Sequence, residues 1–380
     1  MHIQNFTMKS MDKKKNILFI LHLPPPVHGS SLVGQTIRQS KVINSSFECR
    51  YINTLVSRSV NETGKKSFIK VFRFVAVWFQ LLVEIIKKKP DICYLALTAT
   101  GAAFYKDVLL VGLLKLFNIK RIYHLHNKGV ALSASNKINK LLYQFVFKNA
   151  EVILLSNYLY NDIESFVPST RVHICPNGIE DTVTVQKPRL KEKEKSVKIL
   201  FLSNLIESKG VLVLLKACEI ISQKGIDFEC DFVGAEGDLS AKQFNEKVSQ
   251  MQLTSKVNYL GKKFGNEKQN AFATADIFAF PTYYSNECFP LVLLEAMCNG
   301  LPVISTFEGG IPDIVEQGVT GFLISQKDEN SLADKLEELI RNQELRQKMG
   351  SNGRKKFETE FKQEIFEKRM IGIIQKTCIN

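Results

Sequence analysis

The chain has 380 residues, of which 45% are hydrophobic, so it is long enough for two or three domains with sizeable cores. Its net charge is +13, and residues 1–190 carry the excess with 26 Lys and Arg against 11 Asp and Glu, whereas residues 191–380 carry 25 against 27. The eight cysteines show no CxxC pair and no Cys/His ligand spacing, which argues against a zinc site or a disulfide framework and favours reduced thiols in the cytosol.

The basic first half predicts an anionic partner. Because no RNA-binding motif, helix-turn-helix pattern or zinc-finger spacing accompanies the charge, we favour the inner face of a membrane over nucleic acid, with lysine-based solubility as the alternative. The most apolar stretch, Phe68–Ile86, contains three charged residues and falls short of the ~18–20 apolar residues that a membrane span needs. We therefore expect a cytoplasmic, peripheral membrane protein in which one face of this helix touches lipid.

Buried strands and amphipathic helices alternate through the first half, which is typical of a parallel sheet covered on both faces. A turn at Gly29 follows the first strand, and Ser30 and Ser31 can cap the next helix, so the backbone can approach a ligand closely. His124 and His126 share one face at the carboxyl end of a strand, where such sheets bind ligands. The expected strands are 16–23, 49–53, 91–97, 121–126, 151–156 and 171–175, and the expected helices include 68–86 and 102–117, the latter with Lys106, Asp107 and Lys115 on its polar side.

The second half repeats this alternation after a lysine- and glutamate-rich run at 187–196, which we interpret as a solvated linker. Neither half contains an internal repeat. The expected strands are 197–203, 228–234, 257–261, 276–281, 301–305 and the end of the segment 309–324, and the expected helices are 211–222, 267–274, 291–297, 331–349 and a last one at 361–376.

The stretch Asn286–Gly310 carries the most specific pattern. Pro290 suits the first position of a helix whose first-turn N–H groups form a site for an anion such as phosphate. Glu295 lies five residues further, about 7–8 Å along the helix axis, which is roughly the distance from a diphosphate to the ribose of one nucleotide. One helix could thus hold a diphosphate at its tip, a ribose on Glu295 and a sugar near Glu287. The alternative is that Glu295 makes a core salt bridge and Glu287 caps the helix.

Two glutamates eight residues apart around a helix start, followed by a small-residue turn, LPVI and Gly309-Gly310, resemble the signature of retaining family-4 glycosyltransferases of the bacterial surface-polysaccharide type. The resemblance implies an α/β GT-B fold, in which two doubly wound, Rossmann-like domains face a central cleft. It implies an acceptor-side domain at 1–190, a nucleotide-sugar domain at 191–360 and a helix at 361–380 that crosses back. Lys209-Gly210 also match the family, but Ser203-Asn204 replace its Gly-Arg, so one cation is missing.

The resemblance assigns roles to individual residues. It implies that His126 touches the donor sugar, that Glu287 holds sugar hydroxyls and that Lys209 binds the diphosphate, and these three are the expected catalytic residues. No Asp-x-Asp motif occurs, so neither a metal ion nor another cofactor is expected, and Lys209 and the helix tip would stabilise the leaving group. The other expected donor-binding residues are Gly29, Ser30, Asn204, Lys262 or its neighbour Lys263, Phe289, Pro290, Leu291, Glu295, Gly309 and Gly310.

The expected activity is transfer of a hexose or N-acetylhexosamine, with retention of configuration, from a UDP-sugar to a lipid-linked saccharide during surface-polysaccharide synthesis. A GDP-sugar is the second choice of donor. Two other functions stay open at this point. A nucleotide-sugar epimerase can share the architecture, and the Asn204 departure also allows a non-catalytic saccharide-binding subunit.

Overall fold

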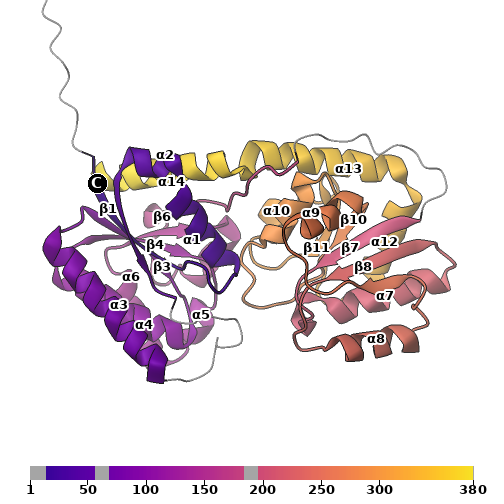
Figure 1. Ribbon diagram of the computed structural model, residues 1–380, viewed down its shortest axis with the longest axis horizontal. Coiled ribbons are helices and arrows are strands. Elements are labelled where there is room, and N and C mark those ends of the chain that lie inside the picture. The colour runs from indigo at the N-terminus through magenta and orange to yellow at the C-terminus, as the bar shows by residue number, and fades with distance from the viewer. Residues whose placement is uncertain (1–13, 56–67, 184–195, 380) are drawn as a thin grey trace, which may run out of the picture.

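A computed structural model describes residues 14–55, 68–183 and 196–379 of the chain. In these ranges the strands form two six-stranded sheets, each entirely parallel (Figure 1). The first sheet has the order β2-β1-β3-β4-β5-β6 and the second has the order β12-β11-β10-β7-β8-β9. Both orders reverse once, at β1/β3 and at β7/β10, so the predicted pair of doubly wound, Rossmann-like sheets is confirmed.

The strands are short, and apart from the edge strands β2, β6 and β9 they are mostly buried, as expected for parallel strands with helices on both faces. The first sheet consists of β1 (Asn16–Leu21), β2 (Glu48–Asn53), β3 (Ile92–Leu97), β4 (Lys120–Leu125), β5 (Glu151–Leu154) and β6 (Val172–Ile174). The second consists of β7 (Val197–Leu202), β8 (Phe228–Val233), β9 (Val257–Tyr259), β10 (Ile277–Ala279), β11 (Val303–Thr306) and β12 (Gly321–Ile324).

Helices connect the strands and cover both faces of each sheet (Figure 1). Those of the first half are α1 (Gly29–Gln39), α2 (Lys41–Ser46), α3 (Phe68–Lys87), α4 (Gly101–Leu116), α5 (Val130–Ser133) and α6 (Lys137–Phe147). Those of the second half are α7 (Val211–Gln223), α8 (Ala241–Gln250), α9 (Gly265–Thr274), α10 (Leu291–Cys298), α11 (Ile311–Ile314), α12 (Glu329–Arg341), α13 (Gln343–Lys356) and α14 (Gln363–Ile379). Within the described ranges, no helix combines the length and the apolar character that crossing a membrane requires.

Three local expectations are corrected by the structure. His28, rather than Ser30 or Ser31, is the N-cap of α1, and its ring accepts a hydrogen bond from the backbone N–H of Ser31 at 3.4 Å. Asp107 does not lie on a polar face of α4, because its buried carboxylate accepts a hydrogen bond from the Thr98 N–H at 2.8 Å. The helix expected at 331–349 is interrupted at Asn342, which leaves the helical conformation and caps α13 with its side chain.

The last helix, α14, packs on the first sheet although it follows the second domain in sequence. Its residues Phe366, Met370 and Ile374 belong to the same buried cluster as Ile17 and Phe19 of β1. Figure 1 shows this helix running along the top of the first domain, beside α1 and α2. The domain boundary expected at 190/191 falls within residues 184–195, outside the described part of the chain.

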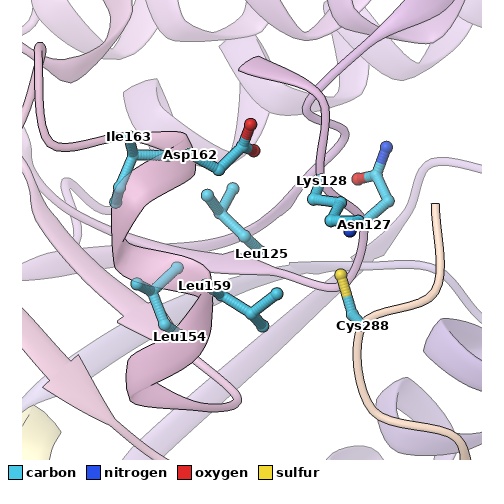
Figure 2. Close-up of a pocket in the computed structure, with 8 residues that line it drawn as sticks. All are labelled: Leu125, Asn127, Lys128, Leu154, Leu159, Asp162, Ile163 and Cys288. Atoms are coloured by element: carbon cyan, nitrogen blue, oxygen red, sulfur yellow. The ribbon is translucent and has the colours of Figure 1, made fainter. Parts of the chain in front are cut away.

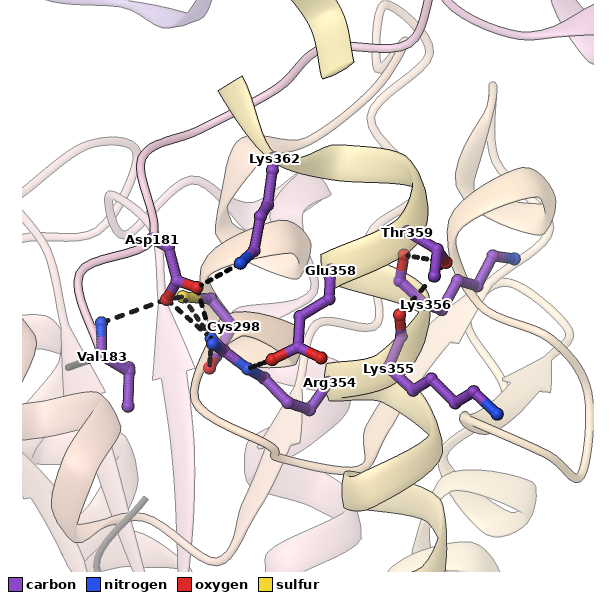
Figure 3. Close-up of polar contacts among 9 residues, drawn as sticks. All are labelled: Asp181, Val183, Cys298, Arg354, Lys355, Lys356, Glu358, Thr359 and Lys362. Atoms are coloured by element: carbon purple, nitrogen blue, oxygen red, sulfur yellow. Dashed lines mark hydrogen bonds and ion pairs between the residues drawn. The ribbon is translucent and has the colours of Figure 1, made fainter. Parts of the chain in front are cut away.

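The two connections between the domains are bonded to each other. The backbone of Ile179 accepts from the N–H of Gln363 at 2.9 Å and donates to the carbonyl of Phe361 at 3.0 Å. Beside this bridge, Asp181 accepts two hydrogen bonds from the Arg354 guanidinium, at 2.6 and 2.8 Å, and its carboxylate lies 3.0 Å from the Lys362 ammonium (Figure 3). Hydrogen bonds from Arg354 hold the pKa of Asp181 well below its usual range.

Candidate functional site

Lys209 and Glu287 form an ion pair at the point where the second sheet reverses its order. Lys209 Nζ lies 2.5 Å from Glu287 Oε2, and the two side chains are 16% and 11% exposed. Lys209 belongs to a 3₁₀ turn after β7, and Glu287 lies in the loop after β10, so the carboxyl ends of two adjacent strands bring them together. The Lys209 ammonium also lies over the Tyr284 ring, 4.3 Å from its centroid. Two residues predicted to act together are therefore in contact.

Gly210 allows this close approach of the two loops. Its φ is +93°, a conformation that favours glycine, and a Cβ atom at this position would lie 2.3 Å from the carbonyl oxygen of Pro281. On the other side of the turn, the Ser208 carbonyl accepts a hydrogen bond from the Tyr283 N–H at 2.7 Å. The loops after β7 and β10 are thus bonded backbone to backbone, which fixes the position of Lys209 relative to Glu287.

Helix α10 points its N-terminus at the loop that carries Glu287. Pro290 is its N-cap and offers no side-chain acceptor, so the N–H groups of the first turn are not capped by a side chain. The positive end of the helix dipole therefore lies close in sequence to Glu287. Leu291 opens the helix. The Phe289 side chain is buried and packs against the Phe361 ring, with centroids 5.9 Å apart. Of the predicted segment 289–291, Phe289 can therefore offer a ligand only its backbone.

Only one of the two carboxylate oxygens of Glu295 has a hydrogen-bond partner among the described residues. Its Oε1 accepts a hydrogen bond from Lys268 Nζ of α9 at 2.6 Å, whereas its buried Oε2 has no hydrogen-bond partner among the described residues. A buried carboxylate oxygen without a donor is unfavourable, because it has lost water without gaining a replacement. The salt bridge of the alternative interpretation is therefore present at one oxygen, the other oxygen lacks a donor, and the ribose role of Glu295 stays a prediction. The partner, Lys268, was not foreseen from the sequence.

The glycine pair after β11 wraps around the loop that carries Glu287. A Cβ atom on Gly309, whose φ is +55°, would lie 2.2 Å from the Glu287 carbonyl oxygen. The N–H of Gly310 donates to the Cys288 carbonyl at 2.7 Å, so this group is already used within the protein. These glycines consequently position the Glu287 loop, and of the two only Gly309 is left to offer its N–H to a ligand.

Two other predicted donor-binding residues lie outside the Lys209–Glu287 pair. Asn204 accepts a hydrogen bond from the Ala235 N–H at 3.2 Å and so ties the loop after β7 to the loop after β8. Lys262 is exposed and lies over the Phe264 ring at 4.5 Å, while its neighbour Lys263 pairs with the nearby Glu267. That one of these lysines supplies the cation missing at Asn204 stays a prediction.

The predicted residues of the first domain gather at the carboxyl ends of β1 and β4. Ser30 Oγ, next to Gly29, lies 3.1 Å from Nδ1 of both His22 and His28. The ring of His126 lies 4.1 Å from the ring of His124, whose Nδ1 is 2.5 Å from the Tyr94 hydroxyl. Sequence reasoning missed His22 and His28, although both flank the glycine turn.

Burial keeps these imidazoles neutral. It lowers the pKa of His22 to about 4 and that of His124 to about 3, and it lowers the pKa of His126 well below 6.5 with help from its histidine neighbours. Each ring then carries one N–H donor and one acceptor nitrogen. His126, which is only half-buried, can offer them to sugar hydroxyls, whereas His124 is fully buried against Tyr94. Within residues 14–55, 68–183 and 196–379, no three His, Cys, Asp or Glu side chains are grouped as metal ligands.

The two domains touch beside these groups. Lys128, two residues after His126, forms an ion pair with the buried Glu308 of the second domain. Ser156 donates to the carboxylate of Asp313 at 2.6 Å. Figure 2 shows Cys288 of the second domain facing the loop of Asn127 and Lys128; these side chains enclose a small cavity together with Leu125, Leu154, Leu159, Asp162 and Ile163. The loops that carry Glu287 and His126 therefore meet at the domain junction.

Several proteins that are similar to this chain are named as glycosyltransferases. The family model described as "Glycosyl transferases group 1" matches residues 183–356. The amylovoran biosynthesis glycosyltransferase AmsK of Erwinia amylovora is 29% identical over 272 residues, which cover 69% of this chain and 65% of the relative. The capsular polysaccharide biosynthesis glycosyltransferase CapM of Staphylococcus aureus is 27% identical over 232 residues, 58% of this chain and 60% of the relative. The chain thus spans less than two thirds of the length of these relatives.

Solved structures agree with the fold over nearly the whole chain. A glycosyltransferase from Rickettsia africae superposes with a TM-score of 0.76 at 19% identity, covering 97% of this chain and 99% of the other. Anabaena HepE, solved in complex with UDP, superposes with a TM-score of 0.73 at 17% identity, covering 95% of this chain and 100% of the other. The chain therefore has the GT-B fold predicted from its sequence, and its residues 183–356 match the family model of the group 1 glycosyl transferases.

Proposed function

We propose that this protein is a retaining glycosyltransferase that moves a hexose or N-acetylhexosamine from a UDP-sugar to a lipid-linked saccharide. The observation that carries the proposal is the Lys209–Glu287 ion pair at the tip of α10, with the unpartnered oxygen of Glu295 further along the same helix. Relatives named for amylovoran, colanic acid and capsular polysaccharide synthesis support surface polysaccharide as the product. Structural neighbours solved with UDP and glucose support UDP over GDP in the donor.

In this proposal each group has a chemical task. Lys209 and the first-turn N–H groups of α10 take up the charge of the departing diphosphate, which removes the need for a divalent ion. Glu287 exchanges its contact with Lys209 for hydroxyls of the donor sugar, and Glu295 Oε2 accepts a hydrogen bond from the ribose. His126, as a neutral imidazole, bonds a hydroxyl on the other side of the sugar.

The reaction breaks the bond between the anomeric carbon and the diphosphate oxygen and forms a bond from the same carbon to the acceptor oxygen. The acceptor hydroxyl proton passes to the leaving diphosphate. Because both events occur on one face of the sugar ring, the anomeric configuration is retained. The lipid part of the acceptor would stay in the cytoplasmic membrane surface, so the proposal includes peripheral association of the protein with that surface.

The test measures donor binding first and turnover second. UDP-glucose, UDP-N-acetylglucosamine and GDP-mannose are added separately, and the melting temperature is recorded; a ligand at 100 times its Kd stabilises by about 2.7 kcal/mol. A UDP-sugar should raise the melting temperature of the wild type and much less that of Glu295→Ala. Equal shifts in both proteins, or no shift with any donor, would contradict the proposed site.

Turnover with a lipid-linked saccharide is then assayed in EDTA, with retention read from the anomeric signal of the product. Loss of activity in EDTA would refute the metal-free mechanism, and an inverted product would refute retention. Conversion of the donor without any acceptor would instead indicate the epimerase. Binding without turnover of any donor would indicate a saccharide-binding subunit.

A further inference from the structure

Helix α3 exposes apolar side chains on the face opposite to its core contacts. Leu81 and Ile85 are buried in the core of the first domain. The outward positions 72, 75, 79, 83 and 86 follow one another at intervals of three or four residues, so they form one stripe along the helix. These positions are Phe72, Val75, Phe79, Val83 and Ile86, with exposed fractions of 76%, 42%, 55%, 45% and 68%. A water-facing helix normally carries polar residues there.

The stripe continues over the neighbouring helices. On α4 the exposed apolar residues are Tyr105, Leu109 and Leu116, and on α6 they are Ile138, Leu141 and Phe145. The Tyr105 hydroxyl donates to Asn139 of α6 at 2.8 Å, and the Lys115 ammonium lies 4.2 Å from the centroid of the Phe145 ring, so the stripes of α4 and α6 share one surface. Helix α3 packs beside α4 on the outer side of the first domain (Figure 1). We call the exposed apolar residues of these three helices the outer apolar face.

Cationic side chains outnumber acidic ones on the helices of this face. Helices α3, α4 and α6 carry seven Lys or Arg residues and two acidic ones. Both acids are already engaged, since Glu84 pairs with Arg50 at 2.8 Å and Asp107 is buried against the backbone of Thr98. Lys87 at the end of α3, Lys137 at the start of α6 and Lys140 one turn further are exposed. A surface of this kind has no negative charge to offer a basic partner, and it suits an anionic one.

We propose that the outer apolar face docks on a bilayer that contains anionic lipids. Exposed aromatic and aliphatic side chains beside lysines are what an interfacial helix presents to acyl chains and phosphate headgroups. This inference deepens the proposed function, on which its link to a lipid-linked acceptor rests. We assign the surface to lipid rather than to a protein, because its apolar residues are spread along three neighbouring helices and its exposed lysines, Lys87, Lys137 and Lys140, carry one sign of charge.

The position of the face relative to the candidate site supports this partner. Thr100, the N-cap of α4, lies next to Gly129 of the loop that follows His126, since a Cβ atom on Gly129 would be 3.0 Å from the Thr100 methyl group. Tyr105, one turn into α4, therefore marks the end of the outer apolar face that is nearest to the site. A saccharide carried on a membrane lipid would reach His126 past this end while its lipid stays in the bilayer.

The experiment uses the full chain and two kinds of vesicle, phosphatidylcholine alone and phosphatidylcholine mixed with phosphatidylglycerol. The wild type should sediment with the mixed vesicles and be released by added salt. Phe72→Ser/Phe79→Ser should weaken this partition by at least about tenfold, because two large apolar groups no longer enter the interface. Lys87→Glu/Lys140→Glu should remove the preference for phosphatidylglycerol. Val42→Ser, an exposed apolar position on α2, is the matched control and should sediment like the wild type.

Several results would overturn the inference. Wild type that stays in the supernatant of both vesicles would do so, as would a Phe72→Ser/Phe79→Ser variant that partitions normally. A dimer in sedimentation equilibrium that this variant dissolves, with no vesicle binding, would assign the face to a second copy of the chain. The UDP-induced melting shift is recorded for every variant. If the wild type binds vesicles but shows no melting shift, the proposed function fails and the docking surface stands. If the wild type shows the melting shift but binds no vesicles, the docking surface fails and the proposed function stands.

Discussion

Replacing Lys209 by Met separates the structural role of the Lys209–Glu287 pair from its proposed catalytic role. With side chains 16% and 11% exposed, the pair is largely shielded from water. Removing one partner of a buried pair costs about 3–5 kcal/mol, because the other charge is left uncompensated, and the remaining exposure places the expected loss near 3 kcal/mol. At about 2–4 °C per kcal/mol for a domain of this size, Lys209→Met should melt roughly 6–12 °C lower than the wild type.

The double variant Lys209→Met/Glu287→Gln should recover most of that melting temperature, since no unpaired charge remains. Activity should behave differently: kcat should fall by about 10²–10³ in the single variant and stay low in the double variant, because the stabilisation of the leaving group is lost in both. Lys242→Met is the control, as this lysine pairs with an exposed glutamate and its loss should cost less than about 1 kcal/mol. Wild-type kcat in Lys209→Met, or a double variant as unstable as the single one, would refute the reasoning.

Three further predictions concern other parts of the molecule. Glu295→Gln should raise the donor KM by about tenfold with little change in kcat, as expected for one charged hydrogen bond to the ribose, and steady-state kinetics would exclude that role if KM is unchanged. Arg354→Met should lower the unfolding free energy in urea by about 3–5 kcal/mol, because it leaves the Asp181 carboxylate and the Cys298 carbonyl without their main donor; an unchanged midpoint would contradict this. Because burial lowers the pKa of His22 from 6.5 to about 4, the unfolded chain takes up a proton before the folded one, so stability should decline as pH falls from 6.5 toward 4, and His22→Asn should flatten that decline in a melting series over pH.

The fold could be predicted because both halves alternate apolar runs of strand length with longer amphipathic segments. Two details of the fold that the sequence predicted wrongly, the polar face of α4 and the single helix at 331–349, have local causes. Asp107 was assigned to a polar face by its charge alone, yet its carboxylate satisfies a backbone N–H at the end of β3, which only the folded chain brings near. Asn342 divides a helix because its side chain caps the next one, a choice that periodicity does not reveal.

The candidate site was predicted where spacing along one element carries the information, and it was missed where tertiary packing does. Glu287 and Glu295 lie on or beside one helix, so their separation follows from helix geometry. Lys268 comes from α9, and its contact with Glu295 depends on how two helices lie against each other. His22 and His28 belong to a loop whose path no local pattern specifies, so their approach to Ser30 could not be derived.

The bonded pair of domain connections limits how the two halves can move. Because Ile179 is hydrogen-bonded to the segment around Phe361 and Asp181 is clamped between Arg354 and Lys362, one connection cannot slide past the other without breaking these bonds. A change in the angle between the domains must therefore bend the chain near Ile179 and near Phe361 together. Opening by such a change of angle would part Lys128 from Glu308 and separate the loops of His126 and Glu287 in one step. In the proposed function, entry of the donor and release of its nucleotide would then share this movement.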